Sequence, residues 1–306
     1  MRLVMLSFLT AALACGSERR QPEPALTPGP PAPPVARDGA GPPPASWVDE
    51  RVRTSMARLR ESEGGAVIAA AIDAHGGLRP WLQAGNIAFE FDYRPLSQPE
   101  RRMHTYQRVD LWSARAVHEE LEGGAGEEAR FGWDGNEAWI TPNAEAFPTP
   151  ARFWALTPYY FVGIPFVLAD PGARFEQLED QVLDGVNHQL VKVTYEDGTG
   201  DAPDDYYIVY VDETARRVAA LRYVVTYPGF FADGQHSPEK LMRYTELRTV
   251  AGLRFATRYD TFAWDGSAPG EKVTEIAVDR IALGADMLES AFARPDGAVV
   301  SELTPR

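Results

Sequence analysis

The stretch that most restricts the fold is residues 181–228, where apolar side chains recur at every second position in three successive runs. Val191 and Val193 belong to the first run, and the second and third runs cover residues 206–211 and 221–227. Alternation of β-branched and aromatic residues predicts strands. The linkers, such as Asp184-Gly185, are turn sequences too short for a helical crossover, so the strands are predicted to be antiparallel neighbours.

The same alternation predicts strands on both sides of this meander. Ile87, Phe89, Phe91 and Tyr93 share one face of a strand over residues 86–94. Further strands are predicted at residues 103–113, 114–121, 128–133, 137–141, 173–182, 240–250, 253–264 and 271–283. An open sheet of this size curls. The predicted fold is therefore mostly β with a few helices (α+β), a curved antiparallel sheet that forms an incomplete barrel of about 11 strands.

Two helices are predicted to precede the sheet and, with a central helical segment, to cover it. The first begins at Ser46 as N-cap, and the second covers residues 66–74 and ends at His75-Gly76-Gly77. Glycine suits a left-handed C-cap, and a histidine suits the negative end of a helix. His75 is therefore interpreted as a capping or packed residue, with a catalytic role as the alternative.

The N-terminus has the pattern of an exported lipoprotein. Residues 1–14 combine an early arginine with an apolar run too short to span a bilayer, which indicates a signal peptide. The run ends in Ala12-Leu13-Ala14-Cys15-Gly16, which resembles a bacterial lipobox, and Cys15 is the only cysteine in the chain. We therefore predict lipidation at Cys15; the alternative is an ordinary signal peptide with a free thiol.

The next segment, residues 15–45, is predicted to be a tether. Ten of the chain's 25 prolines fall between residues 21 and 44, and such a sequence favours extended polyproline conformation. Residues 46–306 are then predicted to form a single domain. The formal charge of −14 disfavours nucleic acid or anionic headgroups as direct electrostatic partners.

Residues 151–171 do not fit the strand pattern. This segment has six aromatic residues between positions 153 and 166, and prolines divide it into short pieces. We predict short helices across the mouth of the curved sheet, acting either as core that plugs the barrel or as a lid over an apolar cavity. In the lid hypothesis, the residues that line or cover the ligand cavity are Phe89, Phe91, Tyr93, Trp154, Tyr160, Phe161, Phe166, Tyr223 and Tyr227.

The sequence contains no recognised catalytic motif. It lacks a Gly-x-Ser-x-Gly elbow, a His-Glu-x-x-His helix, a phosphate-cradling loop and a cysteine or histidine cluster at metal spacing. The acidic residues between 201 and 205 are interpreted as a solvated loop, with weak calcium binding as the alternative. We therefore expect no enzyme activity, no cofactor and no metal site.

Several motifs together resemble the LolA/LolB superfamily and related bacterial envelope lipoproteins that take part in outer-membrane lipoprotein sorting. They are the lipobox and tether, Ala74-His75-Gly76-Gly77 followed by Trp81, a Phe-rich first strand, the hairpin over residues 133–139 and the central helical insertion. The resemblance extends over residues 66–295. It implies a half-barrel whose helices cover a hydrophobic cavity for acyl chains.

Two function hypotheses follow. In the first, the chain binds a lipid or another hydrophobic ligand, such as the acyl chains of lipoproteins, under the lid. In the second, it is a non-catalytic interaction lipoprotein with a filled barrel that docks an envelope protein partner. An open cavity favours the first hypothesis and a solid core the second. In either case the expected location is the cell envelope, anchored to the membrane through Cys15. Because Gly16 is not a retention aspartate, the outer membrane facing the periplasm is favoured, with exposure at the cell surface left open.

Overall fold

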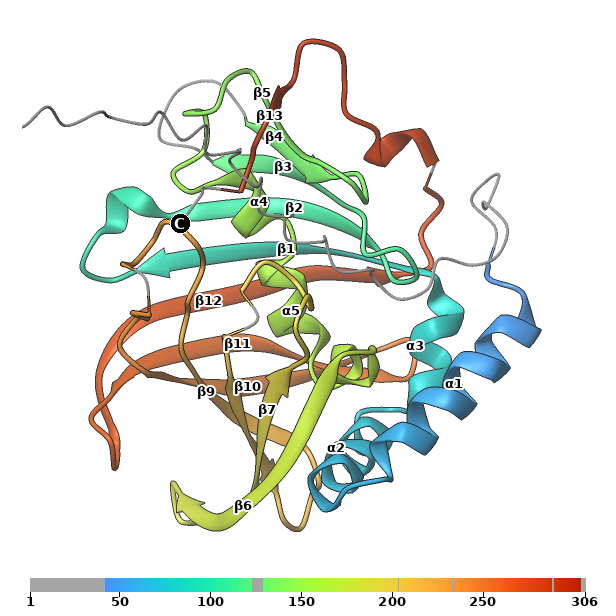
Figure 1. Cartoon of the computed structure of the whole chain (residues 1–306), viewed down its shortest axis with the longest axis vertical. Coiled ribbons are helices and arrows are strands. Elements are labelled where there is room, and N and C mark those ends of the chain that lie inside the picture. Colours follow the sequence, from blue (N-terminus) through green and yellow to red (C-terminus); the bar gives the residue numbers. More distant parts are fainter. Residues whose placement is uncertain (1–41, 123–128, 203, 233, 288, 304–306) are drawn as a thin grey trace, which may run out of the picture.

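Thirteen β-strands form one curved, open sheet (Figure 1). The computed structural model describes residues 42–303 except 123–128, 203, 233 and 288. The order across the sheet is β13-β5-β4-β3-β2-β1-β12-β11-β10-β9-β8-β7-β6, with every pairing antiparallel. The strands are β1 (Asn86–Pro95), β2 (Met103–Asp110), β3 (Ala116–Glu122), β4 (Arg130–Trp133), β5 (Ala138–Thr141), β6 (Ala173–Leu183), β7 (Val186–Tyr195), β8 (Tyr207–Asp212), β9 (Val218–Tyr223), β10 (Lys240–Val250), β11 (Leu253–Trp264), β12 (Pro269–Leu283) and β13 (Val299–Val300). The edge strands β13 and β6 do not pair with each other, so the predicted incomplete barrel is confirmed.

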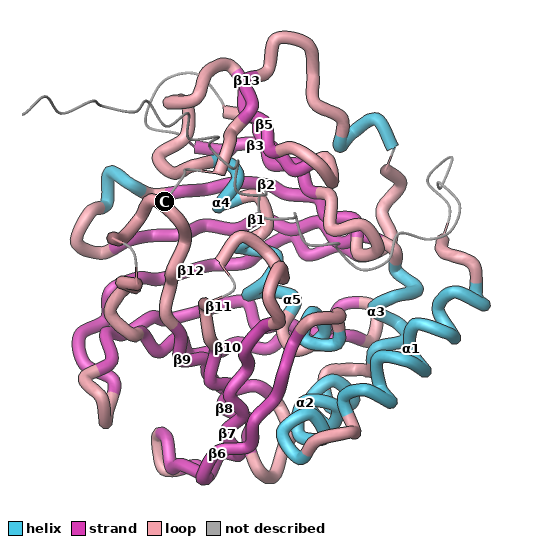
Figure 2. The backbone as a smooth tube through the Cα atoms, viewed as in Figure 1, coloured by secondary structure: helices cyan, strands magenta, loops and turns pink. Residues whose placement is uncertain are grey.

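The helices fall into two groups (Figure 2). The helices α1 (Ala45–Leu59), α2 (Glu63–Ala74) and α3 (Leu78–Ala84) lie together beside the sheet. The short helices α4 (Ala151–Trp154) and α5 (Thr157–Gly163) and the 3₁₀ turn η2 (Phe166–Ala169) follow one another in the chain between β5 and β6. The remaining 3₁₀ turns are η1 (Pro99–Arg101) and η3 (Glu289–Phe292). The short helices predicted for the aromatic segment are thus present.

The junction between α2 and β11 shows why glycine follows His75. The helix begins at Ser62, whose side chain accepts a 3.1 Å hydrogen bond from the Gly65 amide, and His75 occupies its C-cap. Gly76 follows with a φ of +117°, and a Cβ there would lie 2.4 Å from the Gly252 carbonyl oxygen. Any larger residue would therefore push the helix away from the sheet.

The structure corrects three details of the sequence interpretation. Helix α1 begins at Ala45 with Pro44 at the N-cap, so Ser46 is not the cap residue. A residue that precedes proline is disfavoured in the helical region, so residues 42 and 43 cannot extend the helix backwards. Helix α3 was not predicted, since its seven residues are too few to show a clear period. Strand β13 has only two residues and gives no alternation signal.

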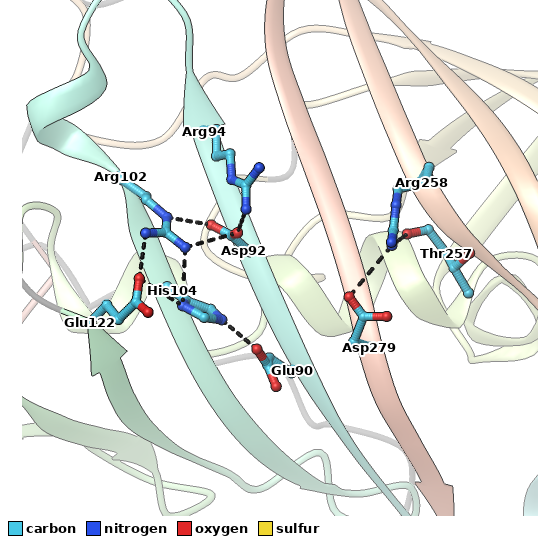
Figure 3. A network of polar contacts seen from close by, with 9 residues as sticks. All are labelled: Glu90, Asp92, Arg94, Arg102, His104, Glu122, Thr257, Arg258 and Asp279. Atoms are coloured by element: carbon cyan, nitrogen blue, oxygen red, sulfur yellow. Dashed lines mark hydrogen bonds and ion pairs between the residues drawn. The ribbon is translucent and has the colours of Figure 1, made fainter.

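Charged side chains cover the outer face of β1 to β3 (Figure 3). The Arg102 guanidinium donates 2.7 Å and 3.0 Å hydrogen bonds to the two carboxylate oxygens of Asp92, and His104 Nε2 lies 2.6 Å from a Glu90 oxygen. Burial works against the charge of Asp92, but hydrogen bonds from Arg102 and Arg94 prevail and lower its pKa. The network assigns the polar positions of β1 to the outer face and the apolar positions to the concave face.

No helix in the described part of the chain is long and apolar enough to cross a membrane. The predicted signal peptide, Cys15 and most of the tether lie in residues 1–41, outside the described residues, and those expectations stay predictions.

Candidate functional site

The concave face of the sheet is lined by aromatic rings in register. Tyr93 on β1 lies opposite Ile276 on β12, Ile276 lies opposite Tyr259 on β11, and Tyr259 lies opposite Tyr244 on β10. Directly opposed residues project to the same face of a sheet. Tyr223 on β9 extends this face, so an aromatic surface crosses the middle of the barrel wall.

The segment from α4 to η2, residues 151–169, packs onto this surface, and we call it the lid. Trp154 of α4 makes edge contacts with Phe91 and Tyr93, at ring-centroid distances of 6.1 Å and 5.4 Å. Phe161 of α5 lies 5.4 Å from Tyr223. In Figure 1, α4 and α5 lie over the middle strands of the sheet. The ring contacts of Trp154 and Phe161 place these side chains between the two helices and the sheet.

The C-terminal end of the lid, η2, also contacts the helices beside the sheet. Phe166 stacks on Trp81 of α3 at a centroid distance of 4.9 Å and lies 6.0 Å from Phe255 of β11. Arg58 of α1 donates hydrogen bonds of 3.0 Å and 2.8 Å to the carbonyl oxygens of Ala169 and Asp170. This end of the lid is therefore bound to both the helices and the sheet.

Individual side chains anchor α4 and α5 to the sheet. His118 Nε2 on β3 donates a 2.8 Å hydrogen bond to the Ala155 carbonyl oxygen, and the Tyr244 hydroxyl donates a 3.0 Å bond to the Phe161 carbonyl oxygen. The hydroxyls of Tyr160 in the lid and Tyr195 on β7 are also hydrogen-bonded. These anchors come from side chains, while strands pair through continuous backbone ladders, so the lid is attached at a few separate points.

An ion pair holds the beginning of the lid. Arg152 donates bonds of 2.7 Å and 2.9 Å to the two carboxylate oxygens of Asp201, and the Arg152 side chain is only 11% exposed. Asp205, four residues later, accepts two bonds from Thr226, and burial raises its pKa to about 6. The interpretation of these acids as a solvated loop is therefore wrong for Asp201 and Asp205, since each has a fixed partner that the sequence does not reveal.

Burial favours the neutral form of two histidines, His118 and His75. It lowers the pKa of His118 to about 4, although the bond to Ala155 works in the opposite direction. His75 has a pKa lowered to about 4 for the same reason; its Nδ1 lies 2.9 Å from the Arg254 carbonyl oxygen, and its Nε2 accepts from the Val218 amide. The packed, capping interpretation of His75 is confirmed.

Gln107 and Trp154 are among the interior side chains that have polar atoms without hydrogen-bond partners in the described part of the chain. Gln107 on β2 is 0% exposed, and neither its amide nitrogen nor its amide oxygen is paired. It lies opposite Phe89 and His118, so it projects from the concave face. The indole nitrogen of Trp154 is likewise buried and unpaired. Such groups carry a desolvation cost that a bound polar group would remove.

Most residues predicted to line or cover a cavity meet in one place. Phe89, Phe91, Tyr93, Trp154, Tyr160, Phe161, Phe166 and Tyr223 all belong to or pack against the main core cluster. Tyr227 lies apart, after β9, where it contacts Phe153 and Phe230 at centroid distances of 4.9 Å and 5.0 Å. Their role as ligand contacts stays a prediction.

Sequence reasoning missed several aromatic residues of the same surface. They are Trp81, Tyr195, Tyr207, Tyr244, Phe255 and Tyr259. Alternation shows that two faces differ but does not say which face is concave. The five of these residues that lie on strands can be assigned to the concave face only once strand register is known, and Trp81 lies on α3, which was not predicted.

A groove of about 610 Å³ lies elsewhere, between α1 and the turn from α2 to α3. Its lining includes Met56, Arg60, Asp73 and Leu78. None of the residues predicted to line or cover a ligand cavity borders it.

Among the described residues, no group of three or more histidine, cysteine or acidic side chains could hold a metal ion.

Comparisons with known proteins give structural matches only. No family model matches the sequence, and no curated protein does. A LolA superfamily protein from Nitrosomonas europaea has 10% identity and a TM-score of 0.49, over 76% of this chain and 97% of that chain. A DUF1329 family protein from Desulfovibrio piger has 8% identity and a TM-score of 0.49, over 75% and 97%.

A putative outer membrane lipoprotein-sorting protein domain from Vibrio parahaemolyticus has 10% identity and a TM-score of 0.43, over 72% of this chain and 97% of that chain. At such identities the similarity concerns the overall arrangement of the chain.

Proposed function

We propose that this protein is an envelope lipoprotein that binds a lipid or another hydrophobic ligand between the concave face of the sheet and the lid. The observation that carries the proposal is the attachment of the lid. Its aromatic rings cover an apolar surface, while separate side-chain contacts, among them those from His118, Tyr244, Tyr195 and Asp201, fix α4 and α5 to the rest of the molecule.

The free energy needed to detach the lid is comparable with the free energy gained by burying an acyl chain in its place. Breaking three neutral hydrogen bonds costs about 3 kcal/mol, and separating a partly buried ion pair adds a similar amount. Burying eight methylene groups of an acyl chain contributes about 6 kcal/mol of binding free energy. A ligand that replaces the rings of Trp154 and Phe161 against the sheet therefore offsets the cost of moving the lid.

The rest of the proposed function comes from the sequence. Cys15 anchors the chain in the membrane, and the proline-rich segment holds the domain away from the surface, with the outer membrane facing the periplasm as the proposed location. Binding is proposed to be non-catalytic. The exposed side chains of Phe230 and Phe231, next to the lid residue Phe153, offer a contact surface for an envelope partner.

A pair of matched substitutions tests the proposal. Trp154→Leu weakens the packing of the lid, so it should raise the affinity for a fluorescent acyl probe about tenfold, because less free energy is needed to reach the open state. Trp139→Leu is the control, since Trp139 is also fully buried but packs with Val117 and Phe292 in a separate cluster. Equal effects of both substitutions, or no uptake by any variant that retains its circular dichroism spectrum, would contradict the proposal.

The second candidate is an interaction lipoprotein with a filled barrel. The specific observation in its favour is that the rings of the lid already pack against those of the sheet, as Phe161 does against Tyr223. It predicts that Trp154→Leu lowers stability without any ligand uptake.

A further inference from the structure

Three polar side chains share the concave face near one end of the barrel, on the neighbouring strands β10, β11 and β12. Thr261 on β11 lies opposite Thr274 on β12 on one side and opposite Met242 on β10 on the other. Lys240 is two residues before Met242 and lies opposite Tyr223 of β9. Opposed residues share a face, and alternate residues of a strand do too, so Lys240, Thr261 and Thr274 project to the side where Tyr223 lies.

Within the described residues, Lys240 and Thr274 have no hydrogen-bond or ion-pair partner, and Thr261 has no hydrogen bond of ordinary geometry. Thr261 is 0% exposed and Thr274 is 6% exposed, and both hydroxyl oxygens are buried without a hydrogen bond of ordinary geometry. Burial raises the pKa of Tyr223 and a side-chain interaction with Thr261 works in the opposite direction, so the Thr261 hydroxyl lies within reach of the Tyr223 hydroxyl. Lys240 is partly buried, and its ammonium group forms no hydrogen bond or ion pair. Burial lowers the pKa of Lys240.

The isolation of Lys240 is unusual in this chain. The sequence has 44 acidic and 30 basic residues but only three lysines. Lys272 pairs with Asp260 and Glu275, and Lys192 lies over the Tyr206 ring. A partly buried cation without a counter-ion, in a protein with excess carboxylates, leaves room for an anion from outside.

The three groups can all donate to one acceptor. An ammonium and two hydroxyls on neighbouring strands match a group with several acceptor oxygens and a single negative charge. Beside them, Met242, Tyr223 and Tyr244 continue as an apolar surface toward the lid. The arrangement therefore fits an amphiphile with an acidic head and an apolar chain.

We propose that Lys240, Thr261 and Thr274 bind the carboxylate of a long-chain fatty acid whose alkyl chain lies on the aromatic surface under the lid. The proposal rests on the proposed function and names its ligand class. A small organic acid carries the same head group without the chain, and the experiment separates the two.

The test uses the full-length lipoprotein in bacterial membranes and two photoactivatable probes, an alkyne-tagged palmitic acid and its methyl ester. The wild-type chain should crosslink the acid about tenfold more than the ester, as expected for one charge-assisted hydrogen bond. Lys240→Met should reduce labelling by the acid to the level of the ester and leave labelling by the ester unchanged. Lys240→Arg should retain the preference for the acid.

Lys192→Met is the matched control, because Lys192 lies between Val191 and Val193 and therefore on the opposite face of the sheet. Thr261→Val is an independent test that keeps the shape of the side chain. It should lower labelling by the acid and leave labelling by the ester unchanged. Unlabelled palmitate should compete with the probe, while excess acetate should not; competition by acetate would mean that the site takes small acids and would overturn the fatty-acid assignment.

Two failures are distinguishable. If neither probe labels the wild-type chain, the proposed function fails together with this inference. If both probes label it equally, or if Lys240→Met lowers both to the same extent, only the carboxylate site is overturned.

Discussion

The hydroxyl of Tyr244 on β10 donates a 3.0 Å hydrogen bond to the main-chain carbonyl oxygen of Phe161 in α5. The bond is buried, and it joins the middle of the sheet to the middle of the lid. A side chain of the barrel wall thus satisfies a backbone group of the segment that covers it. The stability of the closed lid depends on this type of contact.

Tyr244→Phe should loosen α5. The Phe161 carbonyl loses its donor, so the free energy of opening the lid should fall by about 1–2 kcal/mol. Amide hydrogen exchange over residues 157–163 should become about 5 to 30 times faster. Tyr259→Phe is the control, because the Tyr259 hydroxyl bonds to Ala256 of its own strand; equal acceleration in both variants would mean that Tyr244 does not anchor the lid.

The pair of Arg152 and Asp201 should contribute more than a surface ion pair. Its geometry is bidentate, and the two side chains are 11% and 28% exposed. A double-mutant cycle with Arg152→Met and Asp201→Asn, measured by urea unfolding, should give a coupling of about 1–3 kcal/mol. Glu50 and Arg53 offer a comparison at 62% and 68% exposure, where solvent screening should make the coupling clearly smaller. Similar couplings for the two pairs would contradict the anchoring role of Arg152.

Acid should destabilise the protein through its buried histidines. Burial lowers the pKa of His118 from 6.5 to about 4, so the unfolded chain binds more protons between these values. The stability is therefore full above pH 6.5 and is lost as the pH falls toward 4, by roughly 3 kcal/mol for this residue.

His118→Gln should reduce by about half the loss of unfolding free energy between pH 6.5 and 4, since His75 has the same pKa shift and remains. The glutamine amide can still donate to the Ala155 carbonyl without titrating. Urea unfolding between pH 4 and 7.5 measures the difference. An unchanged slope would show that His118 is not a buried neutral anchor.

Gln107→Leu should stabilise the unliganded protein. Both amide atoms of Gln107 are buried without partners, and leucine has a similar volume with no polar atom. We expect the free energy of unfolding to rise by about 1 kcal/mol. A loss of stability in thermal or urea unfolding would instead show that the amide is satisfied in solution.

The sequence predicted most of the sheet because each strand carries its own evidence. The alternation in β1, with Phe89 and Phe91 on one face, indicates a strand with one buried side whatever its neighbours are. The aromatic density of residues 151–171 also predicted short helices over the sheet, which the structure confirms. Local patterns suffice for elements of this kind.

The polar anchors of the site could not be predicted, because each joins residues far apart in the chain. His118 meets Ala155 across 37 positions, and Tyr244 meets Phe161 across 83. The face on which Tyr244 and Tyr259 lie depends on the register between β10 and β11, which alternation alone leaves undetermined. The partner of Asp201 is hidden from local patterns for the same reason, since Arg152 lies 49 positions away in the chain.

Native mass spectrometry tests the central claim most directly. The domain from Ser46 onward, expressed in the periplasm and purified without detergent, would be measured intact and then extracted with organic solvent. Our account predicts a stoichiometric apolar molecule that remains with the folded chain and is recovered in the extract. A clean mass of the protein alone, together with failure to take up a fluorescent fatty acid, would contradict ligand binding under the lid and favour the filled-barrel interaction protein.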